Sequence, residues 1–435
     1  MANPFVSVIN LGCRVNRVES DRMTADLVRA GFSMVDPDEA ELIVVNTCAV
    51  TGEAEAKTRK AVRHALARER SPFVIATGCA VNLHPEMLSE LSDRVAVEPS
   101  KVAVVSRACE LLGFEVDDAA EPDIMPRDIA SLLGRKRLGV KIQDGCNNRC
   151  SYCIVWKARG PERSVPVESV LSQVREAEAA GIPEVVLTGV NLGAYDGVSE
   201  NDSHVEIDEL LSIILDETDI PHIRISSVEP MDVSERLIRV MASHPDRVAP
   251  FLHLPVQSGC TETLRRMNRP YTAEEFEDTV SMIRSLLPAA SLSCDLIVGF
   301  PGETDREFQA SYELCERVGF SRMHVFRYSA RPGTPAAVAP DQIPPETMAE
   351  RSAQVRELAQ RMSRADATKR IGTIERAVIE NGRYATLGSF HKAVVDADCA
   401  LPKDPVFDVE LVAVDDAGIV HVRPCVTVSD GEVPR

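Results

Sequence analysis

The strongest constraint on the fold is a regular alternation of short apolar runs with amphipathic helical runs. Near the start of the chain, apolar runs at 5–12, 41–47 and 73–78 are separated by helical patterns at 16–31 and 51–68. Strands that alternate with helices at this spacing form parallel sheets through right-handed crossovers. We therefore expect an N-terminal parallel α/β domain over residues 1–114.

The alternation stops at residues 115–134, where an acidic stretch with two prolines and no periodicity predicts a linker. It then resumes and predicts six strands, at 138–143, 184–190, 223–229, 251–257, 292–300 and 322–329. Six β/α units are too few for a closed eight-stranded barrel but suit an open, partial (β/α)6 barrel over residues 135–370. Active sites of such barrels lie at the carboxyl ends of the strands. A long helix at 345–370 closes this region.

The last segment, residues 371–435, changes character. Short β-like runs at 375–381, 391–397, 407–414 and 419–424 are separated by turn residues. This pattern favours a small antiparallel β-barrel. A chain of 435 residues is too long for one hydrophobic core. We therefore expect three domains, of which the first two are α/β and the last is all-β.

Three cysteines, Cys13, Cys48 and Cys79, each come directly after one of the N-terminal strands. The carboxyl ends of parallel strands share one sheet edge, so these thiols are expected to meet there. They could ligate an iron–sulfur cluster and leave one iron open, or they could be three buried core cysteines. Both interpretations are open at this point.

A second triad, Cys146, Cys150 and Cys153, lies on one short loop after the first barrel strand. Three thiolates at C-x3-C-x2-C spacing can hold three irons of a [4Fe–4S] cluster. The fourth iron could then chelate the amino and carboxylate groups of S-adenosylmethionine (SAM). Structural zinc needs four ligands, and no fourth Cys or His is near this loop.

The other six of the twelve cysteines stand singly in apolar or helical contexts and are expected to be small buried hydrophobes: Cys109, Cys260, Cys294, Cys315, Cys399 and Cys425. A disulfide framework is not expected, because the start lacks the charged and apolar regions of a signal peptide and no apolar run is of membrane-spanning length. We expect a cytoplasmic protein without membrane contact.

The formal net charge of −19 argues against attraction of the whole molecule to nucleic acid. A local basic helix remains a candidate surface for nucleic acid, with Lys57, Arg59, Lys60 and Arg63. The alternative is that this helix is only a solvated face.

Taken in order, motifs over roughly residues 5–370 resemble the radical SAM methylthiotransferase family. Those of the N-terminal domain are 10–16 (NLGCRVN), 45–50 (VNTCAV) and 77–79 (TGC). Those of the barrel are 145–153 with 158–160, 188–193, 226–230, 252–259, 295–304 and 326–329.

The resemblance implies two [4Fe–4S] clusters, with Cys146, Cys150 and Cys153 holding the one that cleaves SAM. Cys13, Cys48 and Cys79 would hold an auxiliary cluster whose open iron carries sulfur. No side-chain acid or base is expected, because the cofactors perform the chemistry. Strand-end and loop residues are the candidates for the SAM pocket: Tyr152, Gly189, Asn191, Ser227, Glu229 and Gln257. The implied partners are tRNA and a flavodoxin- or ferredoxin-like electron donor, and not DNA.

Residues 12–16 (GCRVN) resemble the branch that acts at C2 of threonylcarbamoyladenosine, at tRNA position 37. The isopentenyladenosine branch usually reads GCQMN there, and the ribosomal-protein branch GCxKN. Modification of isopentenyladenosine or of a ribosomal protein side chain are the alternatives within the family. An alternative outside the enzymes is an iron–sulfur scaffold or redox sensor that performs no catalysis.

The chain also departs from the family pattern. Trp156 and Lys157 stand where a proline and an aromatic residue are usual, and Val165 stands where an arginine is common. The C-terminal barrel occupies the place of a nucleic-acid-binding TRAM domain, yet it is acidic, which disfavours phosphate contact. Any tRNA contact there would fall to a few residues such as His391, Lys392 and Arg423.

Overall fold

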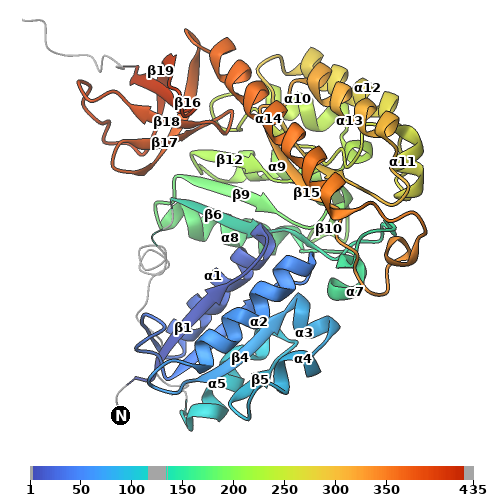
Figure 1. Cartoon of the computed structure of the whole chain (residues 1–435). Helices are drawn as coiled ribbons and strands as arrows, with labels where there is room; N and C mark the ends of the chain where they lie inside the picture. Colours follow the sequence, from blue (N-terminus) through green and yellow to red (C-terminus); the bar gives the residue numbers. More distant parts are fainter. Residues whose placement is uncertain (1–2, 116–133, 135, 426–435) are drawn as a thin grey trace, which may run out of the picture.

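The computed structural model describes residues 3–115, 134 and 136–425. The predicted linker therefore lies almost wholly outside the described residues. Three bodies follow one another along the chain: a parallel α/β unit, an open barrel and a small β-barrel (Figure 1). The predicted fold class is confirmed.

The N-terminal unit is a five-stranded parallel sheet in the order β2-β1-β3-β4-β5. All six residues of the central strand β3 (Leu42–Thr47) are buried, as expected for a strand covered on both faces. Its strands and helices are β1 (Phe5–Asn10), α1 (Arg14–Arg29), β2 (Ser33–Met34), β3, α2 (Gly52–Leu66), β4 (Phe73–Gly78), α3 (Cys79–Leu83), α4 (Glu86–Ser89), β5 (Val95–Val97), η1 (Lys101–Ala103) and α5 (Val104–Leu112).

The central unit holds two parallel three-stranded sheets, β6-β9-β12 and β13-β14-β15. Single bridges, such as the one between Ser227 and His253, join β12 to β13, so the six strands curve as one open barrel. The strands are β6 (Arg137–Lys141), β9 (Glu184–Thr188), β12 (His222–Ile225), β13 (Phe251–His253), β14 (Ser291–Val298) and β15 (Arg322–Arg327).

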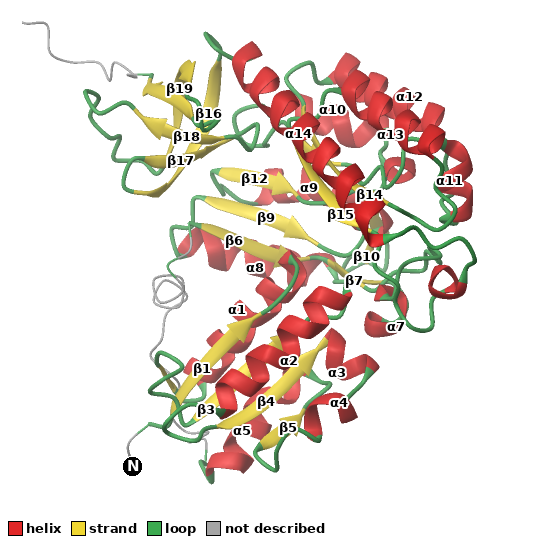
Figure 2. Ribbon diagram, viewed as in Figure 1, coloured by secondary structure: helices red, strands yellow, loops and turns green. Residues whose placement is uncertain are grey.

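Helices cover the outside of this barrel, as Figure 2 shows, and their apolar faces form the largest core of the molecule. Two of them begin with a capping box, at Thr272 and at Thr304. The helices are α7 (Val155–Arg159), α8 (Val167–Ala179), α9 (Ile207–Glu217), α10 (Glu235–Ser243), α11 (Thr261–Arg266), α12 (Ala273–Leu286), α13 (Asp305–Val318) and α14 (Pro345–Lys369). Short turns and strands lie between them: β7 (Gln143–Asp144), β8 (Arg163–Ser164), η2 (Leu192–Ala194), β10 (Asp196–Val198), β11 (His204–Glu206), η3 (Pro230–Asp232) and η4 (Pro335–Val338).

The C-terminal unit is a closed barrel in the order β16-β17-β18-β20-β19. It is antiparallel except for one parallel pair, β18 with β20, which the sequence pattern did not indicate. Its strands are β16 (Ile374–Asn381), β17 (Tyr384–Leu387), β18 (Lys392–Val395), β19 (Val406–Val414) and β20 (Val420–Pro424). In Figure 1 it lies at the end of the central barrel where the strands begin, opposite α7.

The N-terminal unit packs on the first strand of the central barrel through α1. A Cβ atom on Gly139 of β6 would collide with Val18 of α1, so only glycine permits this approach. The start of α2 also reaches the residues just after the last strand, β15, because the Gly52 N–H donates to Ser329 Oγ at 3.1 Å. The N-terminal unit therefore spans both edges of the open barrel.

Candidate functional site

The loop with Cys146, Cys150 and Cys153 runs from β7 to α7, at the carboxyl end of the first barrel strand. The Cys146 N–H donates to Gly160 O at 3.2 Å, and the Cys153 N–H donates to Cys150 O at 3.1 Å. Ser151 fixes the loop to α11, because its hydroxyl donates to Arg266 O at 2.8 Å. Backbone and side-chain hydrogen bonds thus hold all three thiols on one short arc.

These three thiols lie close enough to affect one another. Burial, followed by the neighbouring Cys150 and Cys146, raises the pKa of Cys153 to about 12. Two donors point at the sulfurs: the Val155 N–H at 3.4 Å from Cys153 Sγ, and the Arg269 guanidinium at 3.2 Å from Cys150 Sγ. Donors of this kind stabilise thiolates, so the loop is suited to bind iron through sulfur.

The N-terminal triad is brought together from three strand ends. Cys13 caps the start of α1, Cys48 follows β3, and Cys79 is the first residue of α3. Gly12 has a φ of +94°, and a Cβ atom there would stand 2.7 Å from the Cys48 sulfur. Glycine at this position is therefore required for the close approach of the Cys13 and Cys48 loops.

The electrostatics of this triad also indicate mutual proximity. Burial raises the pKa of Cys48 to about 11, and Cys79 and Cys13 add to the effect. Burial also raises the pKa of Cys79, while Arg159 opposes it. Within the described residues no three His, Cys, Asp or Glu side chains surround a single metal ion. A cubic iron–sulfur cluster takes each thiolate on a different iron.

Buried amides lock the loops that carry Cys13 and Cys48. The Asn16 side chain donates to Leu11 O and to Thr47 O, both at 2.8 Å, and Asn46 donates to Asn16 O at 2.8 Å. The Thr58 hydroxyl donates to Cys48 O at 3.0 Å. Such supporting bonds orient metal ligands in proteins.

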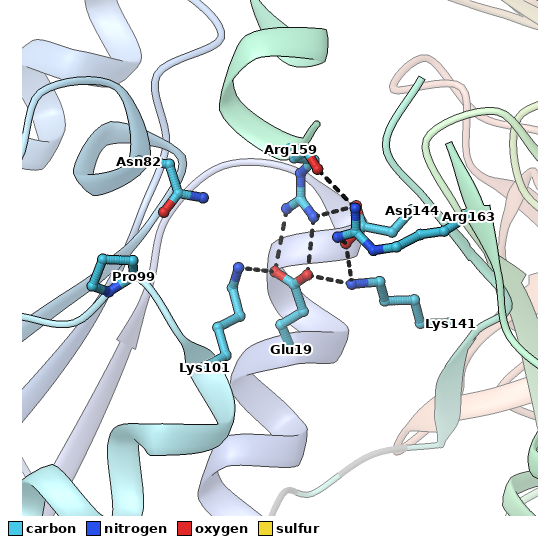
Figure 3. Close-up of a pocket in the computed structure, with 8 residues that line it drawn as sticks. All are labelled: Glu19, Asn82, Pro99, Lys101, Lys141, Asp144, Arg159 and Arg163. Carbon is cyan, nitrogen blue, oxygen red and sulfur yellow. Dashed lines mark hydrogen bonds and ion pairs between the residues drawn. The ribbon is translucent and has the colours of Figure 1, made fainter. Parts of the chain in front are cut away.

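Arg159 contacts residues that support both triads. Figure 3 shows Arg159 and the ion pairs around it. It lies one turn after the second cysteine loop, and its guanidinium donates to Asn16 Oδ1 at 2.6 Å and to Glu19 Oε1 at 2.9 Å in α1. It also donates to Asp144 Oδ1 at 2.9 Å, just before the cysteine loop. One buried side chain therefore ties the supports of both triads together.

The ion pairs around Arg159 line a cavity of about 220 Å³ between the N-terminal unit and the barrel. Lys141 reaches Glu19 at 2.6 Å, and Lys101 reaches it at 3.2 Å. Burial alone would raise the pKa of Glu19, but Arg159 first and then Lys101 and Lys141 lower it to about 2. Glu19 is therefore a carboxylate at neutral pH, and this network is fully charged.

The SAM-pocket candidates lie on the loops at the barrel's carboxyl end, and their role stays a prediction. Tyr152 packs with Phe300 and Tyr328 beside the cysteine loop. Gly189 is a glycine because a Cβ would stand 3.0 Å from that of Gln143. Asn191 donates to Asp232 at 2.8 Å, and its own side-chain oxygen is buried without a partner among the described residues.

The remaining candidates follow β12 and β13. Ser227 bridges to His253, and Gln257 bridges to Leu296 of β14. Gln257 has a φ of +59°, a costly conformation for a side chain larger than glycine. Glu229 forms a buried ion pair with Arg269, although burial raises the pKa of this carboxyl.

Sequence reasoning missed Gln143 and Arg269. The Gln143 carboxamide accepts from the backbone N–H groups of Val190 and Asn191, at 2.9 and 3.0 Å, and donates to Gly145 O at 3.0 Å. It thus joins the cysteine loop to the next strand end. Arg269 was not among the candidates, because its contacts with Cys150 and Glu229 exist only in the folded chain.

The four basic residues predicted to bind tRNA do not share one face. Lys57, Lys60 and Arg63 are exposed on α2, at the spacing of one helix face. Arg59 is half-buried and turns to Met87 of α4, with Nη1 3.5 Å from the sulfur. Arg59 is therefore less exposed than the other three residues, and contact of all four with tRNA stays a prediction.

The C-terminal barrel offers little free positive charge. His391 is buried and bonds to Asp366 at 2.8 Å, so it is not a surface residue. Arg423 pairs with Asp396 at 3.0 Å. Of the three residues suggested for tRNA contact, Lys392 alone is exposed without an ion pair in the described part of the chain.

Known protein families and relatives match most of this chain. Residues 140–315 match the model of the Radical SAM superfamily, and residues 6–98 match that of the uncharacterized protein family UPF0004. The chain is 36% identical over 362 residues to the threonylcarbamoyladenosine tRNA methylthiotransferase MtaB of Thermotoga maritima, covering 82% of each chain.

Relatives with other substrates are nearly as similar. The ribosomal protein uS12 methylthiotransferase RimO of a Roseiflexus species is 31% identical, covering 90% of each chain. A tRNA-2-methylthio-N(6)-dimethylallyladenosine synthase of Bdellovibrio bacteriovorus is 32% identical, covering 86% of this chain and 84% of its own.

Among solved structures, the cobalamin-bound radical SAM methyltransferase TsrM of Kitasatospora setae superimposes with a TM-score of 0.55 at 16% identity. The match covers 78% of this chain and 77% of that one. At this identity the likeness concerns the fold alone. No described helix is long and apolar enough to cross a membrane.

Proposed function

This chain belongs to the radical SAM methylthiotransferase family, and we propose that it inserts a methylthio group at C2 of threonylcarbamoyladenosine, at position 37 of tRNA. The observation that carries the proposal is the meeting of two cysteine triads at one domain junction, joined through Arg159. Five relatives named for this substrate, at 33–36% identity, support the choice of nucleoside.

In this proposal Cys146, Cys150 and Cys153 hold the cluster that binds SAM, and the N-terminal triad holds a second cluster. When bound, these groups supply a 5′-deoxyadenosyl radical and the sulfur to be transferred. The side chains of the protein would orient these groups and enclose them. Arg269 donates to Cys150 and holds Glu229, so it connects the cysteine loop to the end of β12.

Further residues would shape the SAM pocket. The Gln143 side chain accepts hydrogen bonds from the backbone of Val190 and Asn191. These bonds hold the end of β9, with the candidate Asn191, next to the cysteine loop. Gln257 keeps its strained backbone because Asp295 O and Ile297 N bind its main chain, at 2.9 Å each. Strain of this kind is often found at functional sites.

For tRNA we propose the exposed face of α2 with Lys57, Lys60 and Arg63. The helix begins beside Ser329, at the end of the last barrel strand, so this basic face borders the junction of the two triads. Clustered positive charge would offset the strongly negative net charge of the molecule where phosphates approach. Reducing electrons would come from a flavodoxin- or ferredoxin-like protein.

Nucleoside mass spectrometry of tRNA from cells with and without this chain tests the proposal. We expect the 2-methylthio derivative of threonylcarbamoyladenosine to disappear and its precursor to accumulate. Loss of the dimethylallyl product instead would assign the chain to that substrate. If cells without this chain keep their tRNA modifications but contain unmodified ribosomal protein uS12, as measured by intact-protein mass, the substrate would be the protein side chain.

A further inference from the structure

The inner wall of the open barrel carries uncovered polar and charged side chains on its last strand. In β15, Met323 and Val325 pack on the helical core, whereas Arg322, His324 and Phe326 are exposed. The two sets alternate, as expected when one face of a strand packs on helices and the other borders an open space. Arg322 therefore faces the interior of the barrel.

The end of the barrel where the strands begin is closed by a loop of the C-terminal unit. Phe390 stacks on Phe251, the first residue of β13, with ring centroids 4.7 Å apart. Beside it, Ser389 O accepts from Ser291, the first residue of β14, at 2.7 Å. We call this closed end the barrel floor, formed by Phe390 and its neighbours.

Four arginines from four different elements surround Phe390. Their guanidinium carbons lie 4.7–5.6 Å from the ring centroid, and they are Arg14 of α1, Arg137 of β6, Arg224 of β12 and Arg322 of β15. The aromatic face attracts each of them. Like charges at such spacing repel one another, so each needs a counter-charge or solvent.

Two of the four have carboxylate partners and a structural task. Arg224 is fully buried, pairs with Glu184 at 3.1 Å and donates to Gly388 O at 2.9 Å, which fastens the floor loop. Arg137 pairs with Glu380 of β16 at 2.7 Å. These pairs occupy the carboxylates of Glu184 and Glu380.

Arg14 and Arg322, which we call the cationic pair, have no ion pair or hydrogen bond to a carboxylate anywhere in the described ranges. Both side chains are exposed, so they are open to a ligand. Both share the Phe390 ring with Arg224 and Arg137, so like charges repel one another there. A bound anion would relieve this repulsion.

The cationic pair is connected to both triads through neighbouring residues. Arg14 directly follows Cys13, and both Arg14 and Arg322 lower the pKa of His324 on the inner face, after burial. Next to His324 in register is Asp295, which bonds to His253 at 3.4 Å. Asp295 in turn acts on Glu229, the partner of Arg269 beside Cys150. The cationic pair is thus linked to the N-terminal triad through Cys13, and to the barrel triad through Asp295, Glu229 and Arg269.

We propose that Arg14 and Arg322 bind the carboxylate of the threonylcarbamoyl group on the substrate nucleoside. This inference rests on the proposed function. The threonylcarbamoyl group ends in a free carboxylate, whereas a dimethylallyl group is apolar and uncharged. An apolar group would leave two guanidinium groups unpaired, and sites built for a charged partner discriminate strongly against analogues that lack it.

The test uses holoenzyme and three anticodon stem-loop RNAs that differ only at position 37. One carries threonylcarbamoyladenosine, the second its primary amide in place of the carboxylate, and the third dimethylallyladenosine. Methylthiolation rates at subsaturating RNA and equilibrium binding without SAM are both measured. We expect the wild-type protein to prefer the acid over the amide by roughly tenfold to hundredfold, the worth of a charge-assisted contact.

Arg14→Gln and Arg322→Gln should remove that preference by weakening the acid and leaving the amide unchanged. Arg322→Gln lies far from the N-terminal triad in sequence, so it tests the inference even if Arg14→Gln disturbs folding. Arg239→Gln, an exposed arginine of α10 paired with Glu235, is the matched control and should keep the preference.

A wild-type protein that modifies acid and amide equally would overturn the inference while the proposed function stands. Equal losses on acid and amide in both variants would overturn it too, because they would indicate a structural role. Modification of the dimethylallyl RNA alone would remove the proposed function and the inference together.

Discussion

At the residue scale, single side chains connect parts of the molecule that each hold one triad. Arg159 is the clearest case, because it is buried among two carboxylates and an amide from two units. Burying this many charges is tolerated only when every partner is present. The same scale includes Gly12, whose missing side chain leaves room for the Cys48 sulfur.

Replacing Arg159 by Ala should lower the free energy of unfolding by about 3–5 kcal/mol, because Glu19 and Asp144 lose a buried partner. Arg159→Lys should recover only part of this, since an ammonium cannot bond two groups through a planar fork. Thermal unfolding of the holoenzyme measures the effect, with Arg239→Ala as an exposed control. Equal stability of the Ala variant and the control would show that the network is not needed.

Gly12→Ala should reduce iron content, because a Cβ at φ +94° would press on Cys48 at 2.6 Å. We expect about four irons per chain in place of about eight, by anaerobic iron analysis. Gly113→Ala is the matched control: its φ is also positive, +60°, but nothing lies within 4 Å of the new Cβ. Similar iron content in both variants would contradict the packing argument.

At the scale of elements, α2 is divided between two tasks. Its buried residues Thr58, Val62 and Ala65 pack on the sheet, and Arg59 turns to α4. Lys57, Lys60 and Arg63 stay on the solvent side. Thr51 caps the first turn by accepting from Ala54 N–H at 3.1 Å, so the helix start is well defined beside the barrel.

Reversal of Lys57, Lys60 and Arg63 to Glu should weaken tRNA binding and flatten its salt dependence, because fewer counterions are released. SAM cleavage without tRNA should continue, since these residues do not reach the cysteine loop. The control reverses Arg236 and Arg239 on α10, and Arg59→Ala should have little effect on binding. If the triple variant binds tRNA with unchanged salt dependence, the face is only solvated.

At the scale of the whole molecule, the N-terminal and C-terminal units both pack on the open barrel. The N-terminal sheet edge spans the opening of the barrel, and the floor loop of the C-terminal unit closes its other end. This arrangement gives the acidic C-terminal barrel a task that does not require tRNA contact: it shapes the floor through Phe390.

The separate duties of the two triads can be tested on the intact chain. Cys48→Ala should still form 5′-deoxyadenosine from SAM under reducing conditions, because the barrel triad stays complete. It should form no methylthio product, because the N-terminal triad cannot hold the sulfur to be delivered. Replacing Cys146, Cys150 and Cys153 by Ala should abolish both reactions and leave about four irons. Normal methylthiolation by a well-folded Cys48→Ala variant would make that triad structural.

Local patterns in the sequence were sufficient for the order of the main elements and for the strand-end positions of the N-terminal cysteines, whereas the clusters that the two triads would hold stay a prediction. Strands such as Leu42–Thr47 are apolar throughout because helices cover both faces, and this is visible without any tertiary information. The placement of Cys13, Cys48 and Cys79 at strand ends follows from the parallel sheet, since all carboxyl ends share one edge. The helix at Pro345–Lys369 also begins where its pattern predicted.

Only the tertiary structure decided which charged side chains meet. Arg159 and Asn16 are 143 residues apart, and Arg224 bonds to a loop 164 residues away. Neither contact can be predicted from the periodicity of the sequence, because the packing of whole units decides which long polar side chains lie close together. The same reason explains why Arg59 left the predicted basic face and why the cationic pair around Phe390 was not foreseen. Hydrophobic periodicity determines elements, whereas the net charge of an enclosed space depends on how those elements are brought together.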